Sequence, residues 1–330
     1  MFTPLQKGDT IGIFTPSSAA SVWAVERYER AKQFLEQRGF ILKEGHLTGK
    51  QQAYRSGTPK QRAEELNELL RDSSVKMVMS MIGGTNSNSI LPYIDYEAFR
   101  QQPKIVVGYS DVTAILLALY AKTGVPTFYG PALVPSFGEF PPLVDDTYRY
   151  FERYFCHTPT IPYTIARSDV WSDEAVNWLH YERPKITYVN TWQAVHDTVV
   201  EGRLIGGNNN AMYGCIGTPY FPNIQQGDIL LLEDSMKSAS TVEKNMAMLK
   251  LHGVFDKVGA ILLGKYERYD DEGSGKQPLD LLLEQLDDRP IPILANIDCA
   301  HTHPMFPLPI GRKVRVDTHA QTITCVEPWL

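Results

Sequence analysis

The feature that most constrains this chain is an abrupt change of pattern within residues 104–121, where a β-branched run stops at Gly108–Asp111 and an apolar helical pattern begins at once. In a parallel sheet, such a corner carries Ser110 at the carboxyl edge of a strand, beside the unpaired N–H groups of a helix start. Those groups can hold the oxyanion that forms when a hydroxyl attacks a carbonyl. The corner therefore predicts a serine nucleophile. The alternative is that Ser110 and Asp111 only cap the helix.

The composition indicates a globular protein and argues against binding to nucleic acids or anionic membranes. The 330 residues are 43% apolar, which is enough for a sizeable core. The net charge of −6 disfavours a nucleic-acid polymer or an anionic membrane as partner, because both are bound by clustered basic side chains. The N-terminal residues lack a secretory pattern and no apolar run reaches the roughly 18 residues of a membrane helix, so we expect a cytoplasmic protein.

The cysteines indicate neither a metal site nor a disulfide framework. Zinc sites and disulfide scaffolds both show cysteines at short, regular spacing. Here they are far apart and form no C-x-x-C pair. We therefore expect no metal and no cofactor, with the cysteines packed in the core. The residues concerned are Cys156, Cys215, Cys299 and Cys325.

Strand and helix patterns alternate along the first half of the chain. The alternation predicts an α/β fold with a parallel sheet flanked by helices, Rossmann- or flavodoxin-like. Ligands of such sheets bind outside the carboxyl ends of the strands, where Ser17, Gly84 and Ser110 fall. The predicted strands are 9–14, 75–82, 105–107 and 126–129, and the predicted helices are 22–38 and 59–71, the second with Thr58 as its N-cap.

The second half is richer in strand patterns. Aromatic, proline and charged residues crowd between the halves, which is typical of a crossing between domains. We predict an α/β nucleophile domain at 1–160, a linking segment at 161–185, and a β-rich, barrel-like α/β domain at 186–330. The last of these contains the candidate acid, Glu233, and the candidate histidines, His301 and His303. Its predicted strands are 202–208, 227–233, 258–264 and 291–296, its helices are 241–251 and 279–286, and 312–317 with 321–325 form a hairpin.

A serine nucleophile needs a base, and a histidine oriented by a carboxylate is the commonest solution. His301 and His303 lie in a proline-rich loop after a buried strand, where catalytic side chains concentrate. The pair could instead form a metal site or a structural turn, but no other His/Cys cluster would complete a metal site. Glu233 ends an apolar strand and needs a partner if buried. An ordinary salt bridge or cap is its alternative.

Five short segments follow one another in a characteristic order: Gly83–Ser87 (GGTNS), Gly108–Asp111 (GYSD), Leu204–Asn208 (LIGGN), Leu230–Asp234 (LLLED) and Ala300–Gly311, which begins with AH and ends with LPIG. In this order they resemble the LD-carboxypeptidase family of serine peptidases. The resemblance implies a Ser-Glu-His triad at Ser110, Glu233 and His301, and a homodimer. It selects His301 over His303 by the spacing to the LPIG segment. The chain departs from the family at Ala300, where glycine is common, and directly after LIGGN.

Within that family, the long middle segment at 168–178 and 190–192 is similar to the microcin-immunity branch. This implies a small-molecule peptide or aminoacyl-nucleotide substrate, whose amide-type bond joins an acidic amino acid to a nucleotide analogue. Its cleavage would detoxify an antibiotic. An indole can stack on a nucleobase, a contact worth about 1 to 3 kcal/mol. Trp192 is the candidate for that contact, with simple packing as its alternative. Trp171 and Trp178 are expected to pack within the linking segment.

The mechanism expected is acyl transfer through a serine ester. The backbone N–H groups of Gly84 and Asp111 are the predicted oxyanion donors, because glycine permits close backbone approach. Gly83–Gly84 could otherwise form a tight turn or a phosphate-cradling loop. Lys237 could meet a substrate carboxylate, although a solvated lysine at a helix start is its alternative. The full set of predicted substrate-binding residues is Asn86, Ser87, Trp192, Asn208 and Lys237.

Three rival functions stay open at this point. An α/β-hydrolase esterase shares the chain order of the triad, but its corner carries a glycine two residues after the serine, where this chain has Val112. An LD-carboxypeptidase that recycles murein tetrapeptide would use the same triad. A non-catalytic protein with two lobes around a small ligand would use the same loops.

Overall fold

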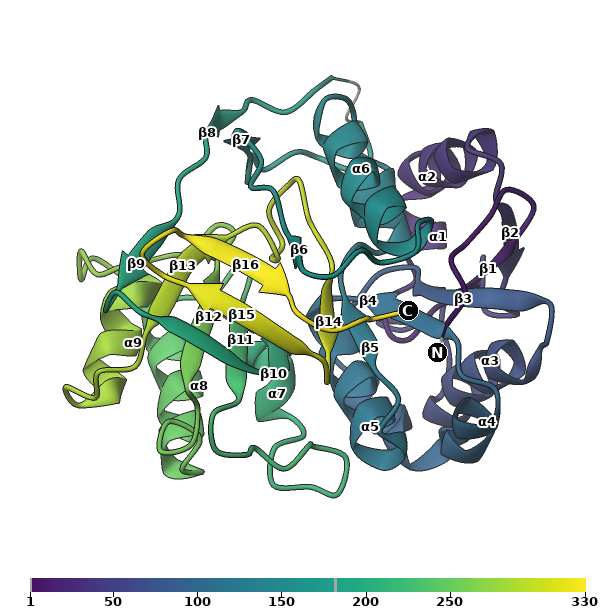
Figure 1. Ribbon diagram of the computed structural model, residues 1–330. Coiled ribbons are helices and arrows are strands. Elements are labelled where there is room, and N and C mark those ends of the chain that lie inside the picture. The colour runs from purple at the N-terminus through teal and green to yellow at the C-terminus, as the bar shows by residue number, and fades with distance from the viewer. Residues whose placement is uncertain (1, 181–182) are drawn as a thin grey trace.

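The computed structural model of the protein describes residues 2–180 and 183–330 and contains two main sheets (Figure 1). The five strands that come first in the sequence run parallel in the first sheet, and the sixth, from near the C-terminus, pairs antiparallel at its edge. The spatial order is β14 (Leu308–Ile310), β5 (Thr127–Tyr129), β4 (Ile105–Gly108), β3 (Val75–Ser80), β1 (Thr10–Phe14) and β2 (Ile41–Glu44).

Helices cover both faces of the first sheet, as Figure 1 shows. One side carries α1 (Ala20–Trp23), α2 (Val25–Gln37) and α6 (Leu143–Phe155), and the other carries α3 (Pro59–Arg71), α4 (Tyr96–Gln101) and α5 (Thr113–Thr123). Three short helical turns complete this part, namely η1 (Ser87–Tyr93), η2 (Ser110–Val112) and η3 (Leu133–Phe137). The predicted α/β fold with a parallel sheet between helices is confirmed.

The second sheet is mixed and open. Strands β10 to β13 run parallel, and the strands beside them are antiparallel. The spatial order is β6 (Tyr163–Thr164), β16 (Thr322–Cys325), β15 (Lys313–Asp317), β10 (Val199–Asn208), β11 (Ile229–Glu233), β12 (Ala260–Gly264), β13 (Ile293–Ile297) and β9 (Gln193–Val195). The β-rich second domain and its C-terminal hairpin are confirmed, but among the described strands β6 and β9 form free edges, so the sheet is not a closed barrel.

The helices of the second domain are α7 (Asn209–Tyr213), α8 (Ala239–Leu251) and α9 (Pro278–Leu286). A separate two-stranded ribbon of β7 (Val170–Trp171) and β8 (Tyr188–Val189) stands above the two sheets in Figure 1. The predicted linking segment, 161–185, includes β6 and β7, and residues 181–182 of it lie outside the described residues.

Helix α5 is the element that joins the two sheets. It is buried all along Thr113–Leu119 and contacts β4 and β5 on one side and β10 on the other. A helix that is apolar all round needs such a two-sided cover. Because α5 follows directly after the Ser110 corner, the corner is fixed between the two domains.

The close contact between the domains requires glycine at the end of β10. Gly206 and Gly207 have φ of +122° and +147°, a region that other residues rarely adopt. A Cβ on Gly207 would lie 2.8 Å from Thr113 Cγ2 and 2.9 Å from Tyr129 Cε2. The glycines of the LIGGN segment are therefore required by the packing between the domains, which the strand pattern alone does not reveal.

Several elements differ from the sequence prediction. The helix predicted at 22–38 is split into α1 and α2 by Ala24, which has a non-helical φ of −128°. The sequence analysis missed β2, because its side chains are mostly exposed and give no buried run. It also missed β14, since Pro309 disfavours a strand, yet proline is tolerated on an edge strand. Because β14 comes from the C-terminal part of the chain but belongs to the first sheet, the two sheets are not formed by two separate halves of the sequence.

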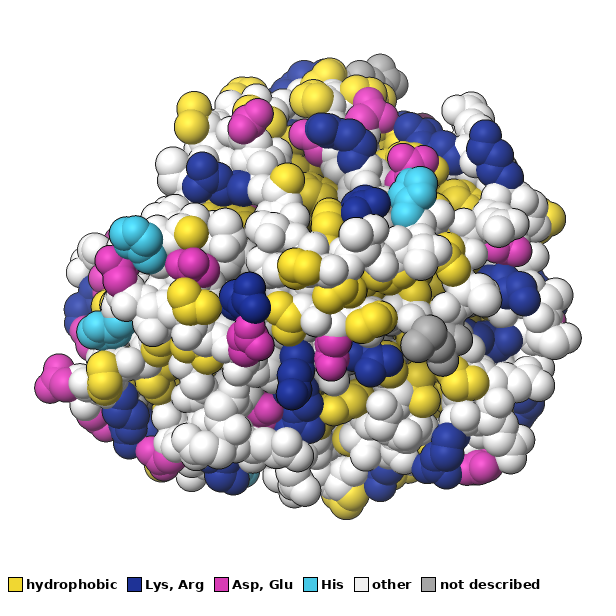
Figure 2. All heavy atoms as spheres, in the orientation of Figure 1, with side chains coloured by type: hydrophobic (Ala, Val, Ile, Leu, Met, Phe, Trp, Pro, Cys, Tyr) yellow, Lys and Arg dark blue, Asp and Glu magenta, His cyan; other side chains and the backbone are white. Residues whose placement is uncertain are grey.

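The surface carries both signs of charge. On the face drawn in Figure 2, Lys and Arg side chains are interspersed with Asp and Glu side chains. Among the described residues there is no helix long and apolar enough to cross a membrane.

The start of α3 provides a test of the local fold. The Thr58 hydroxyl accepts from the Gln61 N–H, and the Gln61 side chain accepts from the Thr58 N–H, which forms a capping box. We expect Thr58→Ala to lower the free energy of unfolding by about 1 kcal/mol, since an N-cap is lost. Chemical denaturation measures this change. Thr58→Ser is the control and should retain most of the stability, whereas equal losses in both variants would contradict the capping role.

Candidate active site

Ser110 lies at the corner between β4 and α5 in a strained backbone conformation. Its φ is +63°, a left-handed value that costs a residue other than glycine about 1 to 3 kcal/mol. The N-cap residues of η2 and α5 are Tyr109 and Val112, so Ser110 does not occupy the N-cap position of either helix. This conformation turns the side chain toward the carboxyl edge of the sheet, where it lines a cavity.

Two neighbours hold the corner in this conformation. The Thr113 hydroxyl donates to the Ser110 carbonyl at 2.6 Å and accepts from the Asn208 N–H at 3.0 Å, which ties the corner to the end of β10. The Ser110 N–H donates to the Tyr129 hydroxyl at 3.1 Å. The strain at Ser110 is therefore supported from both domains.

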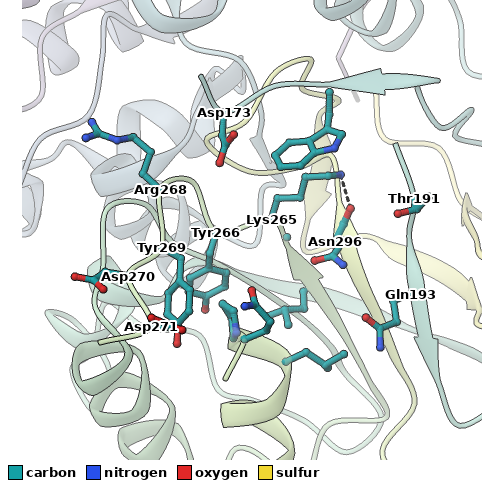
Figure 3. Close-up of a pocket in the computed structure, with 16 residues that line it drawn as sticks. Asp173, Thr191, Gln193, Lys265, Tyr266, Arg268, Tyr269, Asp270, Asp271 and Asn296 are labelled. Carbon is teal, nitrogen blue, oxygen red and sulfur yellow. Dashed lines mark hydrogen bonds between the residues drawn. The ribbon is translucent and has the colours of Figure 1, made fainter. Parts of the chain in front are cut away.

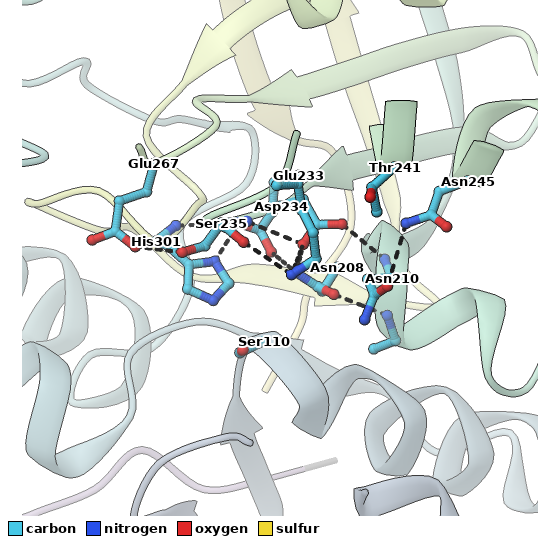
Figure 4. Close-up of polar contacts among 12 residues, drawn as sticks. Ser110, Asn208, Asn210, Glu233, Asp234, Ser235, Thr241, Asn245, Glu267 and His301 are labelled. Carbon is cyan, nitrogen blue, oxygen red and sulfur yellow. Dashed lines mark hydrogen bonds and ion pairs between the residues drawn. The ribbon is translucent and has the colours of Figure 1, made fainter. Parts of the chain in front are cut away.

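Glu233 and His301 form a close pair above Ser110 (Figure 4). Glu233, the last residue of β11, has no exposed area, and its Oε2 lies 2.6 Å from His301 Nδ1. The backbone N–H of His301 donates to the same oxygen at 3.2 Å. The other oxygen, Oε1, accepts from the Tyr129 hydroxyl at 2.5 Å and from Asn208 Nδ2 at 3.0 Å. Every side of the buried carboxylate therefore has a donor.

The pair shifts the protonation of both members. Burial alone would raise the pKa of Glu233, but His301 and the donors of Tyr129 and Asn208 bring that pKa below its usual 4.5. Burial alone would lower the pKa of His301, but the Glu233 carboxylate brings it above the usual 6.5. Glu233 is thus ionised, and it holds the Nδ1 proton of His301 so that Nε2 is left as the basic atom.

Tyr129 links the serine corner to the acid. Its hydroxyl accepts from the Ser110 N–H and donates to Glu233, so one buried group contacts both. Burial, together with the charge of Glu233, raises the pKa of Tyr129 well above its usual 10.0 and keeps the hydroxyl protonated. The edge of the Tyr109 ring packs against the His301 ring at a centroid distance of 4.9 Å. These tyrosines fix the geometry of the pair.

The loop Gly83–Ser87 passes directly beside Ser110. A Cβ on Gly83 would lie 2.8 Å from Ser110 Cβ and 3.1 Å from the Asp111 N atom, so only glycine fits there. Asp111 does not face the cavity with its carboxylate. Its Oδ2 accepts from the N–H groups of Asn86 and Ser87, both at 2.8 Å, and thereby anchors this loop.

A cavity of about 430 Å³ opens between the two domains at this edge. Ser110, His301, Gly84 and Trp178 all line it, together with the side chains of both domains that surround them. The remaining lining residues are Ser18, Trp23, Ile82, Gly83, Thr85, Tyr109, Pro135, Glu174, Ala175, Val176, Lys185, Ser235, Met236, Glu267, Arg268 and His303. Ser110 and His301 therefore line the same cavity, and Glu233 is buried behind His301 and contacts it.

Three of the predicted substrate-binding residues have internal partners instead. The Asn86 side chain contacts Ser17 and the buried Arg62 at 3.1 Å and 2.6 Å. The Ser87 hydroxyl donates to Asp111 at 2.7 Å. Asn208 donates to Glu233 and caps α7 through Ala211. These side chains shape the site from behind and do not line the cavity.

Trp192 and Lys237 also lie outside the lining of the cavity. Trp192 is only 5% exposed, and its Nε1 donates to Asp298 at 3.1 Å, which matches the packing alternative. Lys237 donates to the Ser235 carbonyl at 3.0 Å and lies 3.6 Å from Asp234. Lys237 is thus next to the cavity wall formed by Ser235, with its charge partly balanced.

Two tryptophans line the cavity, Trp23 and Trp178, and the sequence analysis assigned Trp178 to packing. Its ring stacks on Trp23 with 5.6 Å between centroids and an interplanar angle of 18°. The pattern gave no signal for this pair because the two residues lie far apart in the chain. Lys185 and Arg268 also line the cavity and were missed, since single cations on loops look like ordinary surface residues.

A second cavity, of about 500 Å³, lies at the carboxyl ends of β12 and β13 (Figure 3). It contains Lys265, whose ammonium donates to the Asn296 carbonyl and to Asp298, both at 2.5 Å. It shares Arg268 with the cavity around Ser110, but it contains neither that serine nor His301. Despite its size, we therefore place the chemistry at the smaller cavity. Among the described residues there is no group of three or more His, Cys, Asp or Glu side chains that could hold a metal ion.

The fold and this cavity define a class of two-domain α/β proteins with a serine and a histidine–glutamate pair at one cavity. Models of the LD-carboxypeptidase N-terminal domain and of the LD-carboxypeptidase C-terminal domain match residues 11–130 and 201–316. The chain belongs to the LD-carboxypeptidase family.

Relatives of known structure resemble the whole chain. The microcin C7 self-immunity protein MccF of Escherichia coli is 50% identical over 329 residues, 99% of this chain and 96% of MccF. The structure of MccF in complex with aspartyl sulfamoyl adenosine has a TM-score of 0.98 at 49% identity and covers 100% of this chain and 99% of that one. Another MccF structure holds glutamyl sulfamoyl guanosine, with the same TM-score and coverage. An MccF-like protein of Bacillus anthracis is 30% identical with a TM-score of 0.87, covering 98% of each chain.

The Tyr129 hydroxyl can be tested through stability. Tyr129→Phe removes the acceptor of the Ser110 N–H and one donor to the buried Glu233. Because a buried polar group without a partner costs about 1 to 3 kcal/mol, we expect the free energy of unfolding to fall by that amount. Urea denaturation measures it, with Tyr54→Phe at a side chain that is 72% exposed as the control. Equal, small changes in both variants would contradict the bridging role.

Proposed function

We propose that the protein is a serine peptidase that cleaves the amide-type bond between an acidic aminoacyl group and a nucleotide-like leaving group. The observation that carries the proposal is the cavity in which Ser110 lies beneath the His301–Glu233 pair and which also opens onto Trp178. The similarity to MccF, whose structures hold aspartyl and glutamyl sulfamoyl nucleosides, supports the same substrate class.

In the proposed reaction His301 is the base and Glu233 is the acid of the triad. His301 Nε2 takes the proton of the Ser110 hydroxyl as its oxygen attacks the substrate carbonyl. Glu233 keeps the ring in the required tautomer and stabilises the imidazolium that forms. The imidazolium then gives its proton to the leaving nitrogen, and an aminoacyl ester of Ser110 remains. A water molecule, deprotonated by the same histidine, hydrolyses this ester.

The backbone N–H groups of Gly84 and Asp111 are the proposed oxyanion donors. Gly84 lines the same cavity as Ser110 and follows Gly83, which packs against the Ser110 side chain, and Asp111 is the residue after Ser110. One donor of this kind is typically worth about 2.7 to 4 kcal/mol of the barrier. Asp111 also holds the loop of Gly84 through Asn86 and Ser87, so both donors depend on the same carboxylate.

The two ends of the substrate are assigned to different parts of the cavity. We assign the nucleobase to the wall formed by Trp178 and Trp23, because stacked indoles offer a flat face to an aromatic ring. We assign the acidic aminoacyl group to the wall near Arg268 and Lys237, whose cations attract a carboxylate. Trp178 thus takes the role that the sequence analysis gave to Trp192.

Murein tetrapeptide is the second candidate substrate. It is favoured by the LD-carboxypeptidase description of both matching domain models. The triad would be unchanged, but a tetrapeptide has no aromatic group for the indoles of Trp23 and Trp178. We expect it to be the poorer substrate.

A non-catalytic binding protein would have no need for a basic His301 Nε2 beside a serine.

The homodimer and the cytoplasmic location expected from the sequence are part of this proposal. Gel filtration tests the first directly, because a monomer would elute at 37.2 kDa and a dimer at twice that mass.

Substrate specificity and the nucleophile can be tested together. We expect the pure protein to hydrolyse aspartyl sulfamoyl adenosine to aspartate and the sulfamoyl nucleoside, and to hydrolyse murein tetrapeptide more slowly. Ser110→Ala should reduce kcat by about 10⁴-fold or more. Ser235→Ala is the matched control, since Ser235 lines the same cavity without a proposed role in the chemistry. Full activity of Ser110→Ala would contradict the triad, and hydrolysis of the tetrapeptide alone would contradict the substrate.

The raised pKa of His301 predicts the pH dependence of activity. The base must be neutral, and its pKa lies above 6.5, so kcat/KM should fall as the pH drops through a value above 6.5. Glu233, with a pKa below 4.5, stays ionised throughout. Glu233→Gln removes the charge that raises the His301 pKa and should move this acid limb to lower pH, at a lower plateau. A profile between about pH 5 and about pH 9 measures both, and an unmoved limb would disagree with the pairing.

A further inference from the structure

One end of the Ser110 cavity rests on buried charged side chains that the proposed chemistry does not use. Glu139 Oε2 lies 2.9 Å from Arg27 Nη2, 3.4 Å from Lys185 Nζ and 3.8 Å from His303 Nε2. All four side chains are at most 5% exposed. Lys185 and His303 line the cavity, so this cluster forms part of its wall.

The cluster carries more positive than negative charge. Arg27 and Lys185 are two cations that share the single carboxylate of Glu139. His303 contributes no charge, because burial and the nearby Lys185 and Arg27 lower its pKa well below 6.5. A buried charge without a counter-ion is costly, and an anion that enters the cavity would remove that cost.

The place of the cluster in the cavity suggests which part of a substrate it meets. The Arg27 guanidinium lies over the Trp178 ring at 4.3 Å, so the cations adjoin the proposed nucleobase wall. His303 is joined to the segment above the cavity by two backbone hydrogen bonds with Ser172, at 2.8 and 3.0 Å. It follows His301 by two residues, which brings the cluster close to the reacting centre as well.

The acidic side chains of the same cavity have partners of their own. Glu174 accepts from Arg183 at 2.5 Å and from the Ile186 N–H at 2.7 Å. Glu267 accepts from the Ser235 hydroxyl, which is neutral, so Glu267 keeps its negative charge. Glu267 attracts Lys185 electrostatically, but the carboxylate that lies in direct contact with Lys185 is that of Glu139.

We propose that Lys185, backed by Arg27 and His303, binds the anionic group that links the aminoacyl part of the substrate to the nucleoside. This subsite rests on the proposed function and deepens it. Its Arg27 adjoins the indole of Trp178 and its His303 lies two residues from His301, and a phosphate or acyl sulfamate likewise joins the scissile carbonyl to the nucleoside. Lys185 meets the anion as a point charge. Lys185 holds this anionic group while the leaving group departs. The subsite therefore favours substrates whose leaving group carries an anionic linkage over neutral amides.

Calorimetric binding of AMP and of adenosine tests this subsite, since the two ligands differ by the anionic group alone. We expect the wild type to bind AMP about 10- to 100-fold more tightly than adenosine. Lys185→Met should bring this ratio close to one and leave the adenosine affinity unchanged. The variant leaves Arg27 and Glu139 as a neutral pair, so no buried charge loses its counter-ion. Lys185→Arg, the matched control, should retain the preference for AMP.

The possible results separate the subsite from the proposed function. An AMP-to-adenosine ratio that is unchanged in Lys185→Met, or near one in the wild type, overturns the subsite even if the wild type hydrolyses aspartyl sulfamoyl adenosine. A loss of adenosine affinity equal to the loss of AMP affinity also overturns it, because Lys185 would then only maintain the fold. A wild type that hydrolyses no aminoacyl nucleotide and binds neither ligand refutes the proposed function itself.

Discussion

The contact between Glu233 and His301 is the interaction on which the site depends. Glu233 has no exposed area, and a buried carboxylate without a partner would destabilise the fold by several kcal/mol, on the order measured for broken buried pairs. His301, at 2.6 Å, supplies the partner and is itself oriented by it. Tyr129 and Asn208 satisfy the second oxygen. The need to satisfy one buried charge thereby places the basic nitrogen of His301 over the corner of the other domain.

The architecture brings that corner within reach. Helix α5 is buried between the two sheets, and Gly207 lets the end of β10 approach Thr113 and Tyr129 closely. Because Thr113 also holds the Ser110 carbonyl, the nucleophile and the pair are set by the same interdomain contacts. The cavity between them is lined by Ser110 and His301, and the indole of Trp178 is part of the same lining.

The sequence predicts the parts of this site that local patterns encode. The corner at Ser110 shows as a strand that changes directly into a helix, and Glu233 shows as a charge at the end of an apolar strand. Patterns alone could not choose between His301 and His303, which differ in their surroundings and not in their local sequence. His301 was preferred because of the resemblance to the LD-carboxypeptidase family. The residues around the catalytic groups could not be predicted in the same way, because Trp178, Lys185 and Tyr129 contact their partners only through long-range packing. Trp192 has the same aromatic character in the sequence but is buried.

The most direct test of the account is the rate at which a fluorophosphonate labels Ser110, mapped by mass spectrometry of the labelled peptide. The reagent reacts with a serine that a neighbouring base activates, whatever the natural substrate. The account predicts one label, on Ser110, and a labelling rate that falls by about 10⁴-fold in Glu233→Gln, where the buried carboxylate no longer orients His301. A label on another residue, or an equal rate in the variant, would contradict it.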